Sequence, residues 1–248
     1  MQIAVFIVCR LKSERLKEKA LKKINGIPLI SHIINRVSLA KMPEEIILCT
    51  SSLPEDDRLI DIANKHKIKF FRDHPDDVLL RVSKAADHYK VENMLITTGD
   101  NPWVEPMYMD KLIINHINNK NDFTSIKGLP WGTFSYAIDP KATKKCIEIK
   151  LTDDTEVWHG YFQDTGIFKC GSISVEDKEL LWPDLRLTVD TEEDFLFTKK
   201  IYKKLYKKDN LMQLKDIIRM LKENPELLKI NLSVKQKTPN PIKYKIDH

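Results

Sequence analysis

Five cationic side chains gather in one short stretch of the chain and could bind a polyanion. They fall within residues 9–19, directly after the apolar run 3–8, and are Arg10, Lys12, Arg15, Lys17 and Lys19. The run has the length and composition of a buried β-strand, so these charges follow its carboxyl end. Open α/β sheets bind ligands at that edge, and a nucleoside triphosphate is the first candidate. The alternative is a solvated helix face, because Glu14 and Glu18 are interspersed with the cations.

Two aspartates occupy similar places, each where an apolar run ends. Asp100 follows residues 93–98 through Gly99, and Asp190 follows residues 184–189. A carboxylate that faces bound phosphates needs a cation between the two, and Mg²⁺ is usually held by one or two carboxylates together with phosphates. Asp190 can equally cap the helix that begins beside it. Two aspartates at strand ends together with the basic stretch favour a magnesium-nucleotide site.

Alternating strands and helices are needed to bring these residues to one edge of a sheet. The apolar pattern predicts strands over 3–8, 45–50, 68–72 and 93–98, and helices over 28–38, 55–66, 76–89 and 106–118. Asn25 and Gly26 supply a turn before the first helix, and Pro28 suits its start. This βαβα series predicts an α/β fold with a mainly parallel sheet flanked by helices.

The second half of the chain is less regular. We expect strands over 123–127, 133–138, 166–169 and 184–189, a helix over 191–206 that starts with a capping box of Thr191 and Asp194, and a helix over 213–222. Residues 1–232 are expected to form a single domain with a small added lid or dimerisation subregion. Residues 233–248 are expected to form a loosely held tail.

Composition limits the class of protein. The 248 residues carry 41 basic and 36 acidic side chains, and this excess is too small to indicate a nucleic-acid footprint. Cys9, Cys49, Cys146 and Cys170 are widely scattered without zinc spacing, so we interpret them as reduced thiols of a cytoplasmic protein. No apolar run reaches the length of a membrane span, so we expect no membrane association.

The basic stretch resembles a known signature. Arg10, Ser13, Arg15, Leu16 and Lys19 are similar to the R-x-x-S-x-R-L-x-x-K motif of the bacterial sugar-acid cytidylyltransferases, which include CMP-Kdo synthetase, CMP-sialic acid synthetase and the spore-coat polysaccharide SpsF family. The resemblance continues, in order, through residues 26–30, 76–81, 98–102 and 186–194, and the last segment is especially like the SpsF branch. The loop departs from that branch at Lys12 and Lys17, where Gly and Pro are usual.

The resemblance implies a Rossmann-like nucleotidyltransferase fold, with CTP as substrate, Mg²⁺ as cofactor and a homodimer as the assembly. It implies transfer of CMP to an acidic acceptor, either a sugar acid or a phosphorylated small molecule, as a step toward surface polysaccharide. By the same resemblance, nucleotide binding falls to Arg10, Leu11, Ser13, Arg15, Lys19, Arg81 and Asp100, catalysis to Lys19, Arg10 and Asp100, and the metal to Asp100 and Asp190. For the acceptor, aromatic, amide and acidic side chains suit a polar small molecule, and we expect contacts from Trp103, Tyr136, Glu156, His159 and Gln163.

Three other functions were weighed. Residues 100–103 are a weak relative of the D-P-P-Y motif of nucleic-acid base methyltransferases, whose cofactor loop needs glycines that are absent before Asn25. A non-catalytic nucleotide-binding protein of the same fold is a second alternative, although both aspartates and Lys19 argue against lost chemistry. The Lys-rich stretch 199–208 could bind nucleic acid, but it has the pattern of a solvated helix face.

Overall fold

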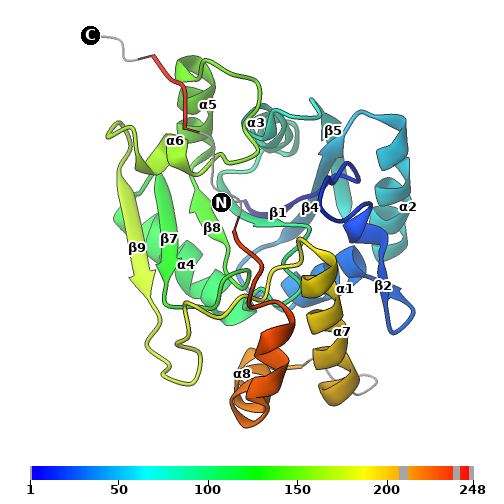
Figure 1. Ribbon diagram of the computed structural model, residues 1–248. Helices are drawn as coiled ribbons and strands as arrows, with labels where there is room; N and C mark the ends of the chain where they lie inside the picture. Colours follow the sequence, from blue (N-terminus) through cyan, green and yellow to red (C-terminus); the bar gives the residue numbers. More distant parts are fainter. Residues whose placement is uncertain (1, 207–211, 237–240, 246–248) are drawn as a thin grey trace.

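The computed structural model describes residues 2–206, 212–236 and 241–245. Its seven-stranded sheet has the order β5-β4-β1-β6-β8-β7-β9, with helices on both faces (Figure 1). The neighbouring strands β5 (Lys69–Asp73), β4 (Glu45–Ser51), β1 (Ile3–Val8) and β6 (Asn93–Thr98) are all parallel. The predicted mainly parallel α/β fold is therefore confirmed.

The order of the strands reverses next to β1. β4 and β5 add to one side of β1, whereas β6 pairs with its other side and brings Val8 opposite Thr98. Such a switch point leaves a crevice beyond the carboxyl ends of the two strands, where open α/β sheets bind ligands. The basic stretch that follows β1 and Asp100, which follows β6, therefore both begin at this crevice.

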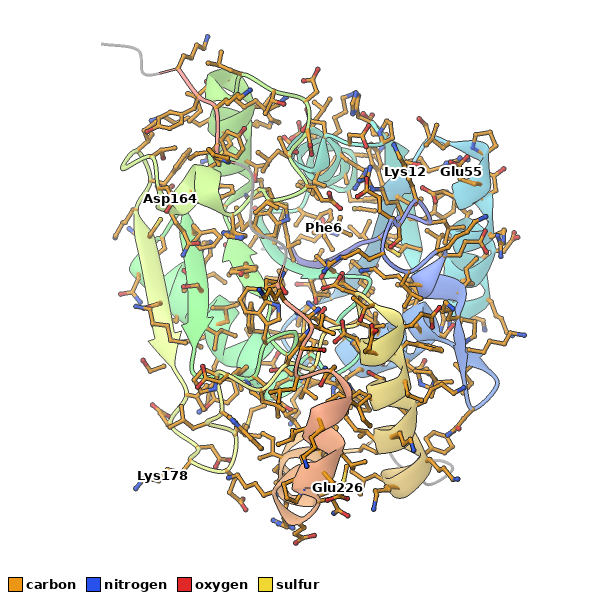
Figure 2. The ribbon with its side chains drawn as sticks, in the orientation of Figure 1. Phe6, Lys12, Glu55, Asp164, Lys178 and Glu226 are labelled. Atoms are coloured by element: carbon orange, nitrogen blue, oxygen red, sulfur yellow. The ribbon has the colours of Figure 1, made fainter. Side chains whose placement is uncertain are left out.

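Each face of the sheet is covered by its own set of helices. One set comprises α1 (Leu29–Val37), α2 (Asp57–His66), α4 (Pro106–Asn119), α7 (Glu192–Leu205) and α8 (Leu214–Glu223), and the other α3 (Val78–Tyr89), α5 (Pro140–Ile149) and α6 (Gly160–Gln163). Along β1, Val5 and Ile7 enter the first core while Ala4 and Phe6 enter the second. Figure 2 shows Phe6 near the centre of the molecule. A strand buried on both faces explains the uninterrupted apolar run in its sequence.

Short elements connect this frame. Three 3₁₀ turns lie at η1 (Lys19–Leu21), η2 (Pro54–Asp56) and η3 (Pro225–Ile230). The strands β2 (Lys23–Ile24) and β3 (Ile27–Pro28) form a hairpin whose turn residues, Asn25 and Gly26, have φ of 50° and 80°. This confirms the turn predicted before α1. The predicted capping box of α7 is also present, since the Thr191 and Asp194 side chains each accept from the other's backbone N–H.

The second half differs from the expected strands. β7 (Phe123–Lys127) lies where predicted, but β8 is limited to Tyr136–Ile138 and β9 begins at Cys170 and ends at Ser174. Gly166 has φ of 72°, a turn conformation, so the strand expected over 166–169 is wrong. The strand expected over 184–189 is also wrong. That segment bonds to loops, with a single bridge between Trp131 and Arg186 and a bond from Val189 N to Asp100 O.

The described part of the tail, which was expected to be loosely held, contacts the body at several points. Leu151 N donates to Lys243 O at 2.8 Å, and Lys245 N donates to Ile149 O at 2.9 Å. Ile242 and Tyr244 pack against the core on the α3 face of the sheet. The remainder of the predicted tail, residues 237–240 and 246–248, lies outside the described residues, as do residues 207 and 208 of the Lys-rich stretch. The domain limit at 232 and the lid or dimerisation subregion stay predictions.

No helix within the described ranges is long and apolar enough to cross a membrane.

Candidate active site

A cavity of about 760 Å³ opens at the switch point between β1 and β6. Its floor includes Val8 and Cys9 from the end of β1 and Thr98, Gly99 and Asp100 from the end of β6. The two strand ends are pressed together here, because a Cβ added at Gly99 would lie 2.4 Å from Cys9 Sγ. The cavity has the size of a small-molecule site and lies where the topology predicts one.

The basic loop, residues 9–19, forms one wall of this cavity. Its lining side chains are Arg10, Lys12, Ser13, Arg15 and Lys19. Figure 2 shows Lys12 on this loop after β1. The predicted nucleotide-binding residues Arg10, Ser13, Arg15, Lys19, Arg81 and Asp100 all line the cavity, and so does Asp190. The structure thus brings the predicted cationic and acidic groups into one cavity.

Lys19 joins the two predicted metal-binding aspartates. Its Nζ lies 2.7 Å from Asp100 Oδ2 and 2.8 Å from Asp190 Oδ1. Burial alone would lower the pKa of Lys19, but the attraction of the two carboxylates outweighs it and raises that pKa. Arg15 Nη2 also lies 3.1 Å from Asp190 Oδ1. The place between these carboxylates is therefore suited to a positive charge.

The ion pairs continue behind Asp190 into the protein. Burial would raise the pKa of Asp190, but Lys19, Arg15 and Arg186 lower it. Arg186 Nη2 lies 2.9 Å from Asp190 Oδ2 and 2.8 Å from Asp194 Oδ2. The five groups Asp100, Lys19, Asp190, Arg186 and Asp194 form a row of alternating charges, which we call the charge chain. It runs from the cavity to the fully buried Asp194.

Arg81 is a buried cation that faces the cavity without a counterion. Only 1% of it is exposed, and its Nη1 donates to the carbonyl oxygens of His74 at 2.7 Å and Pro75 at 3.3 Å. Its Nε has no hydrogen-bond partner, and no carboxylate of the described residues lies within 4.0 Å of the guanidinium. Burial lowers the pKa of Arg81. A buried charge is costly unless it is paired, so the part of the cavity beside Arg81 is suited to an anion.

Asp56 holds the backbone of the basic loop and was missed by the sequence analysis. Its carboxylate is 1% exposed and accepts from Leu11 N at 2.7 Å, Thr50 Oγ1 at 3.0 Å and Ser51 N at 3.2 Å. Leu11 was predicted to contact the nucleotide, but it is buried outside the cavity lining and its amide is bound to Asp56, so the structure does not bring its side chain to this cavity. In the sequence, Asp56 is one of three acids at the start of α2, a pattern typical of a helix terminus.

Among the residues predicted to bind the acceptor, Glu156 alone lines this cavity. Trp103 is 1% exposed and packs in the core, with its ring centroid 4.7 Å from that of Tyr202, so the structure does not bring it to the cavity where the acceptor contact was predicted. Tyr136 stacks on His159 at 6.0 Å and meets the edge of Trp158, which does line the cavity, at 5.2 Å. These aromatic rings form a layer behind the cavity wall, since only Trp158 reaches it.

Tyr136, His159 and Gln163, which were also predicted to contact an acceptor, do not reach the cavity lining. Burial raises the pKa of Tyr136 to about 12 and, despite a bond to Gln163, lowers the pKa of His159. Gln163 is exposed at the end of α6. The ring contacts and burial of Tyr136 and His159 support packing behind the wall.

An acidic rim lies opposite the basic loop and consists of Asp76, Asp153, Asp154 and Glu156. Arg10 forms an ion pair with Asp76 and lies 3.6 Å from Glu156, so it joins the two walls. The rim is anchored from below by Lys150, whose Nζ lies 2.6 Å from the buried Asp77 at the start of α3. Lys150 also forms an isolated β-bridge with Tyr244 of the described tail.

The donor set fits Mg²⁺ only with help from a ligand. Asp100 and Asp190 direct carboxylate oxygens at one shared positive group, which is the arrangement that a divalent ion with phosphate ligands needs. Within the described ranges, no cluster of three or more His, Cys, Asp or Glu side chains could hold a metal ion alone. Phosphate oxygens of a nucleotide would supply the remaining ligands.

Known proteins are similar to this chain in sequence or in fold. The spore coat polysaccharide biosynthesis protein SpsF of Bacillus subtilis is 26% identical over 231 residues, which cover 90% of this chain and 95% of SpsF. A cytidylyltransferase structure from Leptospira borgpetersenii superposes with a TM-score of 0.83 at 21% identity, covering 97% of this chain and 100% of that one. A CMP:2-keto-3-deoxy-manno-octonic acid synthetase solved with CTP has a TM-score of 0.65 at 13% identity, over 82% and 99% of the two chains.

The sequence model of the cytidylyltransferase family matches residues 4–236. This span includes the basic loop, Arg81, Asp100 and Asp190. The chain therefore belongs to the cytidylyltransferase family of CTP-dependent nucleotidyltransferases.

Proposed function

We propose that this protein transfers CMP from CTP to an acidic acceptor, a sugar acid or a phosphorylated small molecule, and releases pyrophosphate. The observation that carries the proposal is the buried guanidinium of Arg81, which has no counterion among the described residues and lies in a cavity whose other wall is the basic loop. A triphosphate would supply the negative charge that Arg81 lacks. The name of SpsF, a spore coat polysaccharide biosynthesis protein, supports surface polysaccharide as the destination of the product.

In this reaction an oxygen of the acceptor attacks the α-phosphorus of CTP in line. A new bond forms between that oxygen and phosphorus, the bond to the bridging oxygen of pyrophosphate breaks, and pyrophosphate leaves with the electron pair. Such chemistry depends on positioning and on neutralising charge more than on covalent help. Arg10, Arg15, Lys19 and Arg81 bind the phosphates and neutralise the charge that grows on the leaving group.

Asp100 and Asp190 are the residues that would hold Mg²⁺, which supplies charge neutralisation between phosphate oxygens when bound. Lys19 now contacts both carboxylates, so it can exchange one of these contacts for a phosphate without leaving the site. Arg10 is paired with Asp76 and Glu156, and the nucleotide would take over that pairing. A homodimer stays part of the proposal and rests on the family resemblance.

The test is a pyrophosphate-release screen that crosses four nucleoside triphosphates with acidic sugars and phosphorylated metabolites. We expect release with CTP, and an Asp100→Ala variant should lose turnover by roughly 10²- to 10³-fold while staying folded. The matched control is Asp61→Ala on the exposed surface of α2, which should keep full activity. CTP binding without release across the whole panel would favour the non-catalytic alternative. Normal turnover by Asp100→Ala would remove Asp100 from the reaction.

A further inference from the structure

We propose that Arg186 is a positioning residue that turns one oxygen of Asp190 toward the cavity, an inference that rests on the proposed function. Arg186 does not line the cavity, and its Nη2 donates to Asp190 Oδ2 at 2.9 Å. The other oxygen, Oδ1, faces Lys19 at 2.8 Å and Arg15 at 3.1 Å, both of which line the cavity. Arg186 thus binds Oδ2, the Asp190 oxygen that points away from the cavity. Oδ1, which faces the cavity, can then bind a cation that enters with the nucleotide.

Asp194 keeps Arg186 in this orientation. Arg186 binds Asp194 as a fork, with Nε 2.9 Å from Oδ1 and Nη2 2.8 Å from Oδ2. Asp194 Oδ2 also accepts from the backbone N of Asp190 at 3.0 Å, so the same carboxylate holds both the arginine and the turn that carries Asp190. Without this counterion, the guanidinium would be free to take both oxygens of Asp190, because such pairs favour two parallel bonds.

The C-terminal segment completes the support. Asn231 Nδ2 donates to Asp194 Oδ1 at 3.0 Å, and Gln236 Oε1 accepts from Arg186 Nη1 at 2.6 Å. Asn231 is buried, whereas the bond to Gln236 lies at the surface. The guanidinium therefore has fixed partners on three sides, from the end of the 184–190 segment, from α7 and from residues 231–236. A lysine at position 186 would keep the charge but could not form this fork.

The experiment compares Arg186→Lys with Arg219→Lys. Arg219 is an exposed arginine that pairs with Glu179 and Asp216 away from the cavity. Binding of Mn²⁺ to the full chain with saturating CTP and no acceptor is measured by electron paramagnetic resonance. We expect Mn²⁺ affinity to fall about 10- to 100-fold in Arg186→Lys, the range seen when a group that orients a metal ligand is changed. CTP affinity without metal should be unchanged, because Arg186 does not line the cavity. A purely structural role would lower stability and leave the Mn²⁺ affinity of the folded protein as it was.

Folding is checked by circular dichroism. If Arg186→Lys is unfolded, Gln236→Ala is used as the second test of the role of Arg186. It removes one surface hydrogen bond to Arg186 and should weaken Mn²⁺ binding by a smaller factor than Arg186→Lys. Wild-type Mn²⁺ affinity in the folded variant, or no Mn²⁺ binding by the wild-type protein with CTP, would overturn the role of Arg186. If the wild-type protein binds CTP and Mn²⁺ but no acceptor reacts, the proposed function fails, and the Mn²⁺ titration still decides the role of Arg186.

Discussion

Replacing Lys19 by methionine should convert the charge chain into a site that needs an added cation to be stable. The two oxygens that contact Lys19 Nζ, at 2.7 and 2.8 Å, can be no more than about 5.5 Å apart. Without the ammonium, two carboxylate charges at that separation repel by about 3 kcal/mol at an effective dielectric constant of about 20. Arg15 and Arg186 also neutralise Asp190, so the net repulsion is smaller than that of a bare pair of carboxylates at the same separation.

The assay is thermal unfolding with and without millimolar Mg²⁺, in the absence of nucleotide. A loss of about 3 kcal/mol lowers Tm by about 6 to 12 °C in a chain of this length. We expect Mg²⁺ to restore part of that loss in Lys19→Met, because a hydrated ion that keeps several of its waters as ligands can take the vacated place between Asp100 and Asp190 without nucleotide. The wild-type Tm should not respond, since Lys19 already supplies the positive charge.

The matched control is Lys22→Met. Lys22 Nζ lies 2.8 Å from Glu192, and two thirds of the Glu192 side chain is exposed (66%), so losing this pair should cost less than about 1 kcal/mol. A Lys19→Met protein that is as stable as the wild type and indifferent to Mg²⁺ would refute both the repulsion argument and the cation site.

Two further predictions concern stability. Burial lowers the pKa of His116 to about 4, below its value of about 6.5 in an unfolded chain, so the unfolded state binds the proton more tightly. This contribution to the free energy of unfolding is present above about pH 6.5, and about 3 kcal/mol of it is lost as the pH falls toward 4. Urea unfolding from pH 7 to 4.5 should therefore show a smaller loss of stability for His116→Gln than for the wild type. An equal pH dependence in the two proteins would exclude the effect. Lys150→Met should lower the free energy of unfolding by about 3 kcal/mol, because the buried Asp77 loses its counterion. Lys144→Met removes only an exposed ion pair with Asp87, so it should lower this free energy by less than about 1 kcal/mol. Equal urea midpoints for these two variants would contradict the anchoring role of Lys150.

Local patterns were sufficient to predict the centre of the site. The run 3–8 is apolar throughout because β1 is buried on both faces, and this places the basic loop at the end of a central strand. The apolar run before Asp100 likewise predicts the buried strand β6 and places Asp100 at its carboxyl end. Both signals depend on residues close in sequence and on a topology with few alternatives, so the meeting of Lys19 and Asp100 was within reach. Asp190 was placed beside them by a strand over 184–189 that the structure does not contain, so its position depended on the family resemblance.

The other contacts depend on packing between distant segments, which no local pattern records. Trp103 follows Asp100 closely, yet it turns into the core because Tyr202 lies there to pack against it. Asp56 reaches Leu11 only because η2 lies beneath the basic loop. Arg186 lies within a segment that resembled a strand, but its neighbours bond to loops, and its side chain turns to Asp194. Each of these contacts joins segments that are distant in the sequence, so only the three-dimensional structure shows it.

The tight contact of the two strand ends restricts how this sequence can change over time. No side chain fits at Gly99 while Cys9 keeps its thiol in place, and Cys9 is itself a poor nucleophile because burial and the charge of Asp100 raise its pKa to about 12. An added Cβ at 99 would also lie 2.7 Å from Cys9 Cβ, so a substitution at 99 becomes tolerable only after the residue at 9 has become glycine, and the effects of the two changes depend on their order. Directed evolution of the cavity floor should therefore recover paired variants at 9 and 99, with the change at 9 arising first.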